Sequence, residues 1–149
     1  MKPAWVLASV LAIPLAGMTW LAWKVVDDLT DDDPLDTRKP ASCTQAMHYA
    51  DQPGLPAGAH DARCEVMTWL DTTYDVEFRI TRTDLDTWLA TAYPGTTLTS
   101  DHCYPETLDA CAHVELKPPA VGGAEAIDIT VQYEGDGNTA LVHFQPFDV

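Results

Sequence analysis

Alternation of apolar and polar residues is the clearest pattern in the second half of the chain. It runs through residues 74–81, 127–134 and 140–145, where apolar side chains recur at every second position. A period of two places one face of a strand in a core and the other toward solvent. These three segments are therefore predicted to be half-buried β-strands.

Turn-forming residues connect the predicted strands. Residues 62–70 have an extended pattern and are followed by Asp71-Thr72-Thr73, so they are expected to form a hairpin with residues 74–81. Residues 134–138 accept positive φ and predict a second hairpin between the last two strands. A fifth strand is expected over residues 113–117, before two prolines. Pro146 predicts that the final strand lies at a sheet edge or ends there.

One amphipathic helix is predicted between the first hairpin and the remaining strands. Thr83 and Asp86 resemble a capping box at its start, and Pro94-Gly95 stops it. An apolar stripe at i, i+3, i+4 and i+7 is formed by Leu85, Trp88, Leu89 and Ala92. The order of elements predicts an α+β fold, with an antiparallel sheet of about five strands and one helix packed on one face.

The N-terminal segment has the composition of a membrane anchor. Residues 3–23 contain no charge, and a helix of that length spans about 31 Å, close to the hydrocarbon thickness of a bilayer. Trp5, Trp20 and Trp23 lie near the two ends of the run, where aromatic rings favour the headgroup level. Residues 1–26 are thus predicted to be a single-pass transmembrane anchor or uncleaved signal sequence. A cleaved signal peptide is the alternative.

An acidic stretch, residues 27–40, separates this segment from the rest of the chain and is predicted to be a linker. Residues 41–149 then form one domain. Lys2 and the short N-terminal tail place the N-terminus in the cytoplasm, whereas Arg38 and Lys39 weigh against that orientation. The cysteines favour an extracytoplasmic domain at the cell membrane.

The four cysteines are Cys43, Cys64, Cys103 and Cys111. An even number in a small exported domain predicts two disulfides, and all three pairings are open. A thiolate metal site that includes His102 and His113 is the alternative, but the spacing matches no common zinc module. No metal site is assigned.

The charge argues against nucleic acid as a partner. The chain carries 23 acidic and 8 basic residues, a net charge of −15. Nucleic-acid binding needs a basic surface, which is absent from the sequence. The charge is explained by solubility, or by attraction of a cationic partner or ion.

No catalytic or cofactor motif is present. Ser100, Asp101 and His102 are chain neighbours that point in different directions, so they cannot form a triad. No phosphate-binding or dinucleotide-binding glycine loop occurs, and no cofactor is expected. The sequence favours a non-enzymatic module that binds an unknown protein or small ligand through the sheet or residues 96–110. The alternative is a cell-envelope hydrolase that uses paired carboxylates.

The chain as a whole resembles a known type of protein. The matching features are the short anchor, the acidic linker, the segments YDVEFRI and TDLDTWLATAYPG, and the closing AIDITVQYEGDGNTALVHF. The resemblance is to small membrane-anchored or secreted proteins of unassigned function from high-GC Gram-positive (actinobacterial) bacteria. It implies a location and an architecture, and it assigns no catalytic residue.

Overall fold

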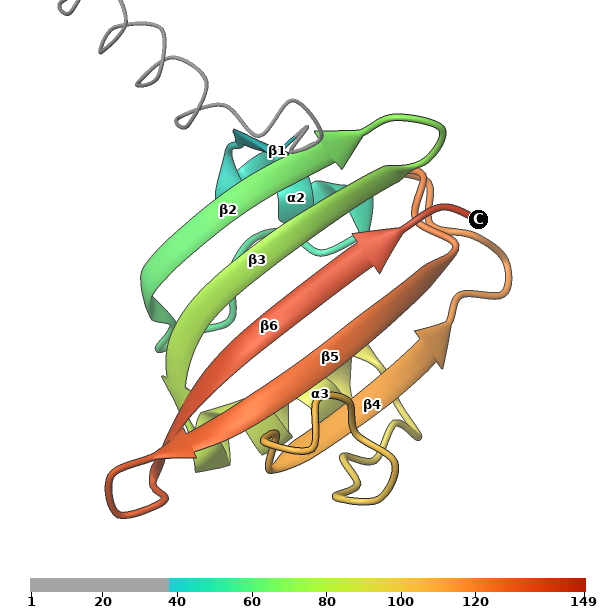
Figure 1. Ribbon diagram of the computed structural model, residues 1–149. Coiled ribbons are helices and arrows are strands. Elements are labelled where there is room, and N and C mark those ends of the chain that lie inside the picture. Colours follow the sequence, from blue (N-terminus) through green and yellow to red (C-terminus); the bar gives the residue numbers. More distant parts are fainter. Residues whose placement is uncertain (1–37) are drawn as a thin grey trace, which may run out of the picture. The chain divides into compact units, whose positions relative to one another are not determined.

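The computed structural model describes residues 38–149, which fold around one antiparallel sheet with helices on one of its faces (Figure 1). In chain order the elements are β1 (Arg38–Pro40), α2 (Cys43–Tyr49), β2 (His60–Thr68), β3 (Thr72–Thr81), α3 (Arg82–Ala92), β4 (Ala110–Glu115), β5 (Ala126–Glu134) and β6 (Thr139–Phe147). The spatial order of the strands is β1-β2-β3-β6-β5-β4. The predicted α+β class and the antiparallel sheet are confirmed.

Two elements lie where the sequence predicts none. β1 occupies residues 38–40 of the predicted linker and pairs with β2, and α2 follows it directly. A three-residue strand and a seven-residue helix are too short to show a hydrophobic period. Isolated helices of that length are also unstable in water, so α2 depends on burial of Ala46 and Met47. The described residues therefore form six strands and two helices, instead of about five strands and one helix.

The core lies between the sheet and the two helices. The predicted alternation is confirmed on the three central strands, where every second side chain is buried. The stripe of α3 packs on this face, and the Trp88 ring meets the rings of Phe78 and Phe144 edge-on, at centroid distances of 6.0 and 5.5 Å. Edge-to-face aromatic pairs add about 0.5–1.5 kcal/mol each beyond the burial of their surface. Aromatic contacts therefore fix the position of α3 on the sheet.

The start of α3 differs from the predicted capping box. Thr81, the last residue of β3, is the N-cap: its hydroxyl accepts a hydrogen bond from the Asp84 backbone amide and donates one to the Asp84 carboxylate. The predicted pair of Thr83 and Asp86 is wrong by two residues. β3 runs into the helix without a loop, so the extended conformation of Thr81 already suits the N-cap position.

The expectation that Pro146 marks a sheet edge is wrong, because β6 is a central strand between β3 and β5, whereas the alternative that the strand ends there agrees with the end of β6 at Phe147. Pro146 lies inside β6, is buried, and pairs in register with Ile127 of β5. On the other side, the β3–β6 pairing passes from Phe144 to Phe147 without a partner for Pro146. The gap in that ladder accommodates the missing N–H of proline.

The cysteines form two disulfides, as predicted, with the two local pairings. Cys43–Cys64 joins the start of α2 to β2, and Cys103–Cys111 joins the 96–110 segment to β4. β4 starts at Ala110, three residues before the predicted strand, and Cys111 also exchanges backbone hydrogen bonds with Thr99. The 96–110 segment is therefore fixed to the sheet at two adjacent points.

Neither helix within residues 38–149 is long and apolar enough to cross a membrane. The predicted anchor at residues 3–23 lies outside the described residues, so it stays an expectation from the sequence.

The two disulfides are predicted to contribute unequally to stability. Their sequence separations of 21 and 8 residues correspond in the loop-entropy model to about 3.4 and about 2.6 kcal/mol. Replacing Cys43 and Cys64 with Ser should therefore lower the free energy of unfolding more than the same change at Cys103 and Cys111. Urea unfolding of the two double variants measures the order, and the reverse order contradicts the loop-length argument.

Candidate functional site

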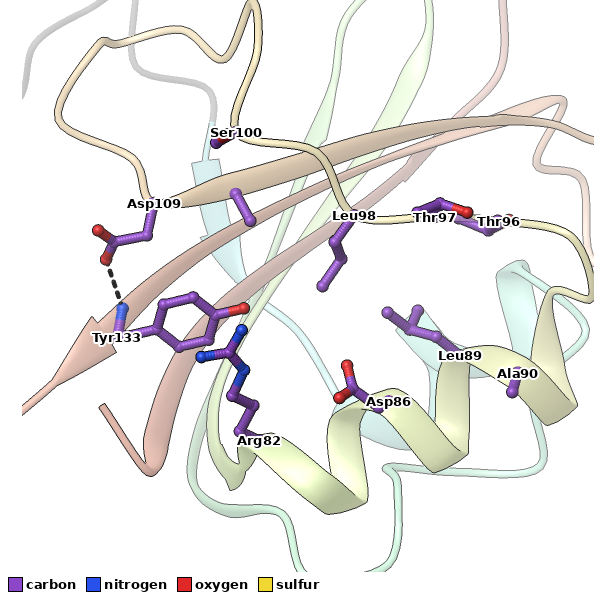
Figure 2. A pocket seen from close by; sticks show the side chains of 11 residues that line it. Arg82, Asp86, Leu89, Ala90, Thr96, Thr97, Leu98, Ser100, Asp109 and Tyr133 are labelled. Carbon is purple, nitrogen blue, oxygen red and sulfur yellow. Dashed lines mark hydrogen bonds between the residues drawn. The ribbon is translucent and has the colours of Figure 1, made fainter. Parts of the chain in front are cut away.

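A groove of about 460 Å³ lies between α3 and the 96–110 segment, on the helix-covered side of the sheet (Figure 2). Its floor is apolar and is formed by Leu89, Leu98 and Ala110. Its polar lining comes from Arg82, Asp86, Thr96, Thr97, Ser100, Asp109 and Tyr133. This volume is within the usual range for small-molecule sites. The groove is the candidate functional site.

The guanidinium of Arg82 stacks on the ring of Tyr133 at one end of the groove, 4.4 Å from the ring centroid. Both residues are held by backbone contacts. The Arg82 amide donates to the Asn138 carbonyl at 2.9 Å, and the Tyr133 amide donates to the Asp109 carboxylate at 2.6 Å. The cation therefore occupies a defined place on an aromatic surface.

The position of Arg82 is unfavourable for the helix that contains it. Arg82 is the first residue of α3, where a cation opposes the helix dipole by about 0.3–1 kcal/mol. No carboxylate pairs with its guanidinium among residues 38–149, so the described cation is balanced only by the Tyr133 ring. The contact with the Tyr133 ring, which contributes about 0.5–1 kcal/mol at an exposed site, is of the same size as this cost.

Asp86 lines the same groove one helical turn further along α3 (Figure 2). Its carboxylate makes no hydrogen bond or ion pair with any described residue. Arg82 and Asp86 are four residues apart, but an arginine that precedes an acid along a helix has the less favourable orientation for pairing. The groove thus presents an unpaired cation and an unpaired carboxylate from exposed residues one helical turn apart.

Several charged residues on the uncovered face of the sheet are, in contrast, paired with one another. Arg79 makes two hydrogen bonds of 2.9 Å to the Glu134 carboxylate, and His113 lies 2.6 Å from an Asp128 oxygen. His143 lies between two carboxylates, with Nδ1 3.4 Å from Asp75 and Nε2 3.6 Å from Glu77. These groups satisfy each other, which leaves the groove as the better binding site.

The contact between His143 and Asp75 shifts both pKa values. The hydrogen bond to Asp75 is the largest cause that raises the pKa of His143, with further increases from the charges of Asp75 and Glu77. Burial raises the pKa of Asp75, but the hydrogen bond and charge of His143 outweigh it, so this pKa is lowered. On the β5 side, the cross-strand neighbour of His143 is the uncharged Thr130.

The structure places the residues singled out in the sequence in different surroundings. Ser100 lines the groove, and no hydrogen bond joins it to Asp101 or His102 among the described residues. Cys103 and Cys111 are bonded to each other, so they do not provide thiolate ligands. Residues 38–149 contain no group of three or more His, Cys, Asp or Glu side chains placed to hold a metal ion.

Sequence reasoning offered residues 96–110 as a binding surface but missed the parts of the groove that come from α3 and β5, because its polar residues belong to three separate segments. The one available signal was the cation at the first position of a helix, which contradicts the dipole rule. Comparisons of the chain with protein-family models, with curated proteins and with solved structures return no match.

The stability of the protein should depend on pH through His143. Because its pKa is raised from the ordinary value of 6.5, its contribution is complete below that value and is lost as the pH rises through the raised one. The lowered pKa of Asp75 gives a contribution present above its ordinary 3.8 and lost as the pH falls through the lowered value. The contact is therefore most stabilising between these limits.

His143→Gln should destabilise the protein at about pH 5.5 and have a much smaller effect at about pH 8.5, measured by thermal unfolding. The control is His102→Asn, since asparagine tolerates the positive φ of this exposed residue. An equal loss of stability for His143→Gln at both pH values would show that its imidazolium contributes nothing.

Proposed function

We propose that the domain is a non-enzymatic binding module, tethered to a membrane on its extracytoplasmic side, that binds a small zwitterionic ligand in the groove. The ligand class is an amino acid or a short peptide. The observation that carries the proposal is that the groove presents the Arg82 guanidinium and, one helical turn away, the Asp86 carboxylate, and that neither has a charged partner among the described residues.

The two charges match the two ends of such a ligand. An arginine fork binds a carboxylate through two parallel hydrogen bonds, and a carboxylate such as Asp86 accepts hydrogen bonds from an ammonium group. Side chains four residues apart on a helix have Cβ atoms about 5–6 Å apart. That spacing suits a molecule in which a carboxylate and an ammonium lie close together.

The rest of the groove fits the remaining parts of an amino acid or peptide. Leu89 is buried and, with Leu98 and Ala110, gives a surface for an apolar side chain. The hydroxyl groups of Thr96, Thr97 and Ser100 along the 96–110 segment both donate and accept hydrogen bonds, as amide groups require. Seven of the eleven lining residues are polar, so the groove suits a polar or charged ligand with a small apolar part.

The proposed location is supported by the disulfides and by the N-terminal sequence. Two disulfides in a small domain are typical of an oxidising compartment. The uncharged run at residues 3–23 has the length of a membrane span.

The hydrolase alternative rests on Asp86 and Asp109, which both line the groove. Binding is favoured over hydrolysis because the Asp109 carboxylate is already used by the Tyr133 amide. Hydrolysis catalysed by a pair of carboxyl groups also requires that one of them have a raised pKa. The carboxyl groups with shifted pKa values in the described residues are Asp75, Glu115, Glu134 and Asp136, and all four values are lowered.

The dipeptide Ala-Leu should bind the full chain in detergent micelles, measured by calorimetry. N-acetyl-Ala-Leu-amide, which lacks both charges, should not bind. Arg82→Gln and Asp86→Asn should each weaken binding of Ala-Leu by roughly tenfold to a hundredfold, because a hydrogen bond to a charged group contributes about 1.5–3 kcal/mol.

Arg63→Gln and Asp101→Asn are the matched controls, since each removes one charge from an exposed position that does not line the groove. Equal binding of the capped peptide, or no effect of the groove variants, would contradict the proposal. Cleavage of the dipeptide during incubation, detected by mass spectrometry, would favour the hydrolase instead.

A further inference from the structure

Exposed apolar side chains gather at one end of the sheet. Six large hydrophobic residues are exposed within residues 38–149, and five of them are at this end: Met67, Trp69, Leu70, Val121 and Val149. The register explains the grouping, because Phe147 pairs with both Thr73 and Ala126. The β2–β3 turn, the β4–β5 loop and the end of β6 therefore lie together, as the upper right of Figure 1 shows. We call this the hairpin end.

Trp69 and Leu70 form the tip of the β2–β3 hairpin, with 84% and 83% of their surface exposed. The turn is closed by a hydrogen bond from the Trp69 amide to the Asp71 carbonyl, which any side chain at position 69 permits. Neither side chain belongs to the core. A single exposed apolar residue is ordinary, but adjacent Trp and Leu at a turn are not explained by the fold.

The β4–β5 loop holds Val121 at the same end by specific contacts. The Asp51 carboxylate accepts hydrogen bonds from the backbone amides of Val121 and Gly122, at 2.8 and 3.1 Å. Val121 itself is 97% exposed. Hydrogen bonds therefore hold the backbone at Val121 in place, so part of the apolar surface of the hairpin end has a fixed position.

The chain also enters the domain at the hairpin end. Arg38 of β1 pairs with Met67, and β1 is antiparallel to β2, so the described chain begins on the side of the Trp69 turn. The sequence outside the structure consists of the uncharged run 3–23 and the stretch that follows it. Residues 27–37 are 11 residues long and span at most about 36–40 Å. The first described residue and the apolar surface thus share one end of the domain.

From this coincidence we infer that the hairpin end rests on the lipid bilayer, with Trp69 and Leu70 inserted at the boundary between headgroups and acyl chains. Tryptophan prefers that depth. The inference rests on the expectation that residues 3–23 span the membrane. A tethered domain has a high effective concentration at the surface, so two inserted side chains suffice for contact. The acidic charge of the domain excludes attraction to anionic lipid, so the contact is apolar and persists in high salt.

The test uses the full chain in phosphatidylcholine vesicles, with and without brominated acyl chains that quench tryptophan fluorescence on contact. Subtracting the spectrum of Trp69→Phe from that of the unmodified chain isolates the emission of Trp69, because the other four tryptophans are common to both. This emission should be blue-shifted and quenched by the brominated lipid, at low and at high salt. Leu70→Ser should reduce the quenching.

The control places a tryptophan at the other end of the sheet. Tyr104 lies in the loop before β4, away from the hairpin end, and is 89% exposed. In Trp69→Phe/Tyr104→Trp, the new emission should remain water-like and unquenched. Equal quenching at both positions would overturn the inference, as would a Trp69 emission that brominated lipid leaves unchanged.

Two other outcomes are also decisive. A blue-shifted but unquenched Trp69 would mean that a protein, such as a second copy of the chain, covers the hairpin end instead of lipid. Failure of the full chain to float with the vesicles would overturn the anchor and the inference together. Neither outcome bears on ligand binding in the groove, because dipeptide binding is measured separately in micelles.

Discussion

The apolar face of the sheet must be covered, and this constraint determines the rest of the domain. The inner side chains of β3, β6 and β5 are fully buried, including Phe78, Phe144 and Ile129. A twisted sheet of this kind cannot leave such a face in water. α3 covers β3 and β6 through the Trp88 contacts, while α2 covers β2 and β3.

The groove results from the way in which α3 and the 96–110 segment lie over the sheet. α3 packs over the middle of the sheet, and the 96–110 segment returns along β4 to reach the outer strand. The Cys103–Cys111 disulfide and the bridge from Thr99 to Cys111 hold this segment near the sheet. The space between α3 and this segment is therefore bounded by parts that cannot separate freely. A bounded site loses less conformational entropy when it binds a ligand.

Charge is distributed differently on the two sides of the sheet. On the uncovered side, neighbouring strands place acids within contact of Arg79, His113 and His143. In the groove, Arg82 faces an aromatic ring and Asp86 has no partner among the described residues. Arg63 on the other side of the sheet also lacks an ion pair among the described residues, so Arg82 is distinguished by its place in the groove and on the Tyr133 ring.

The sequence was sufficient for the strands and the helix that follow a regular period. Segments such as Tyr74 to Ile80 carry their burial pattern in the order of their residues, and the structure agrees. It was insufficient for α2 and β1, which are too short to have a period, and for Pro146, whose acceptability depends on a neighbouring strand. The groove was out of reach because Arg82, Asp109 and Tyr133 meet only after the sheet has formed.

The two proposals place the functions of the domain at opposite ends of the same strands. Thr72 begins β3 at the hairpin end, and Arg82 follows its last residue, Thr81. Ten residues of strand extend about 33 Å, so a domain that rests on its hairpin end holds the Arg82–Tyr133 pair far from the bilayer. Electrostatic screening is then that of bulk water, with a Debye length of about 8 Å at physiological salt. In that placement, the charged end of the groove would face the aqueous phase, where zwitterionic ligands are free to diffuse.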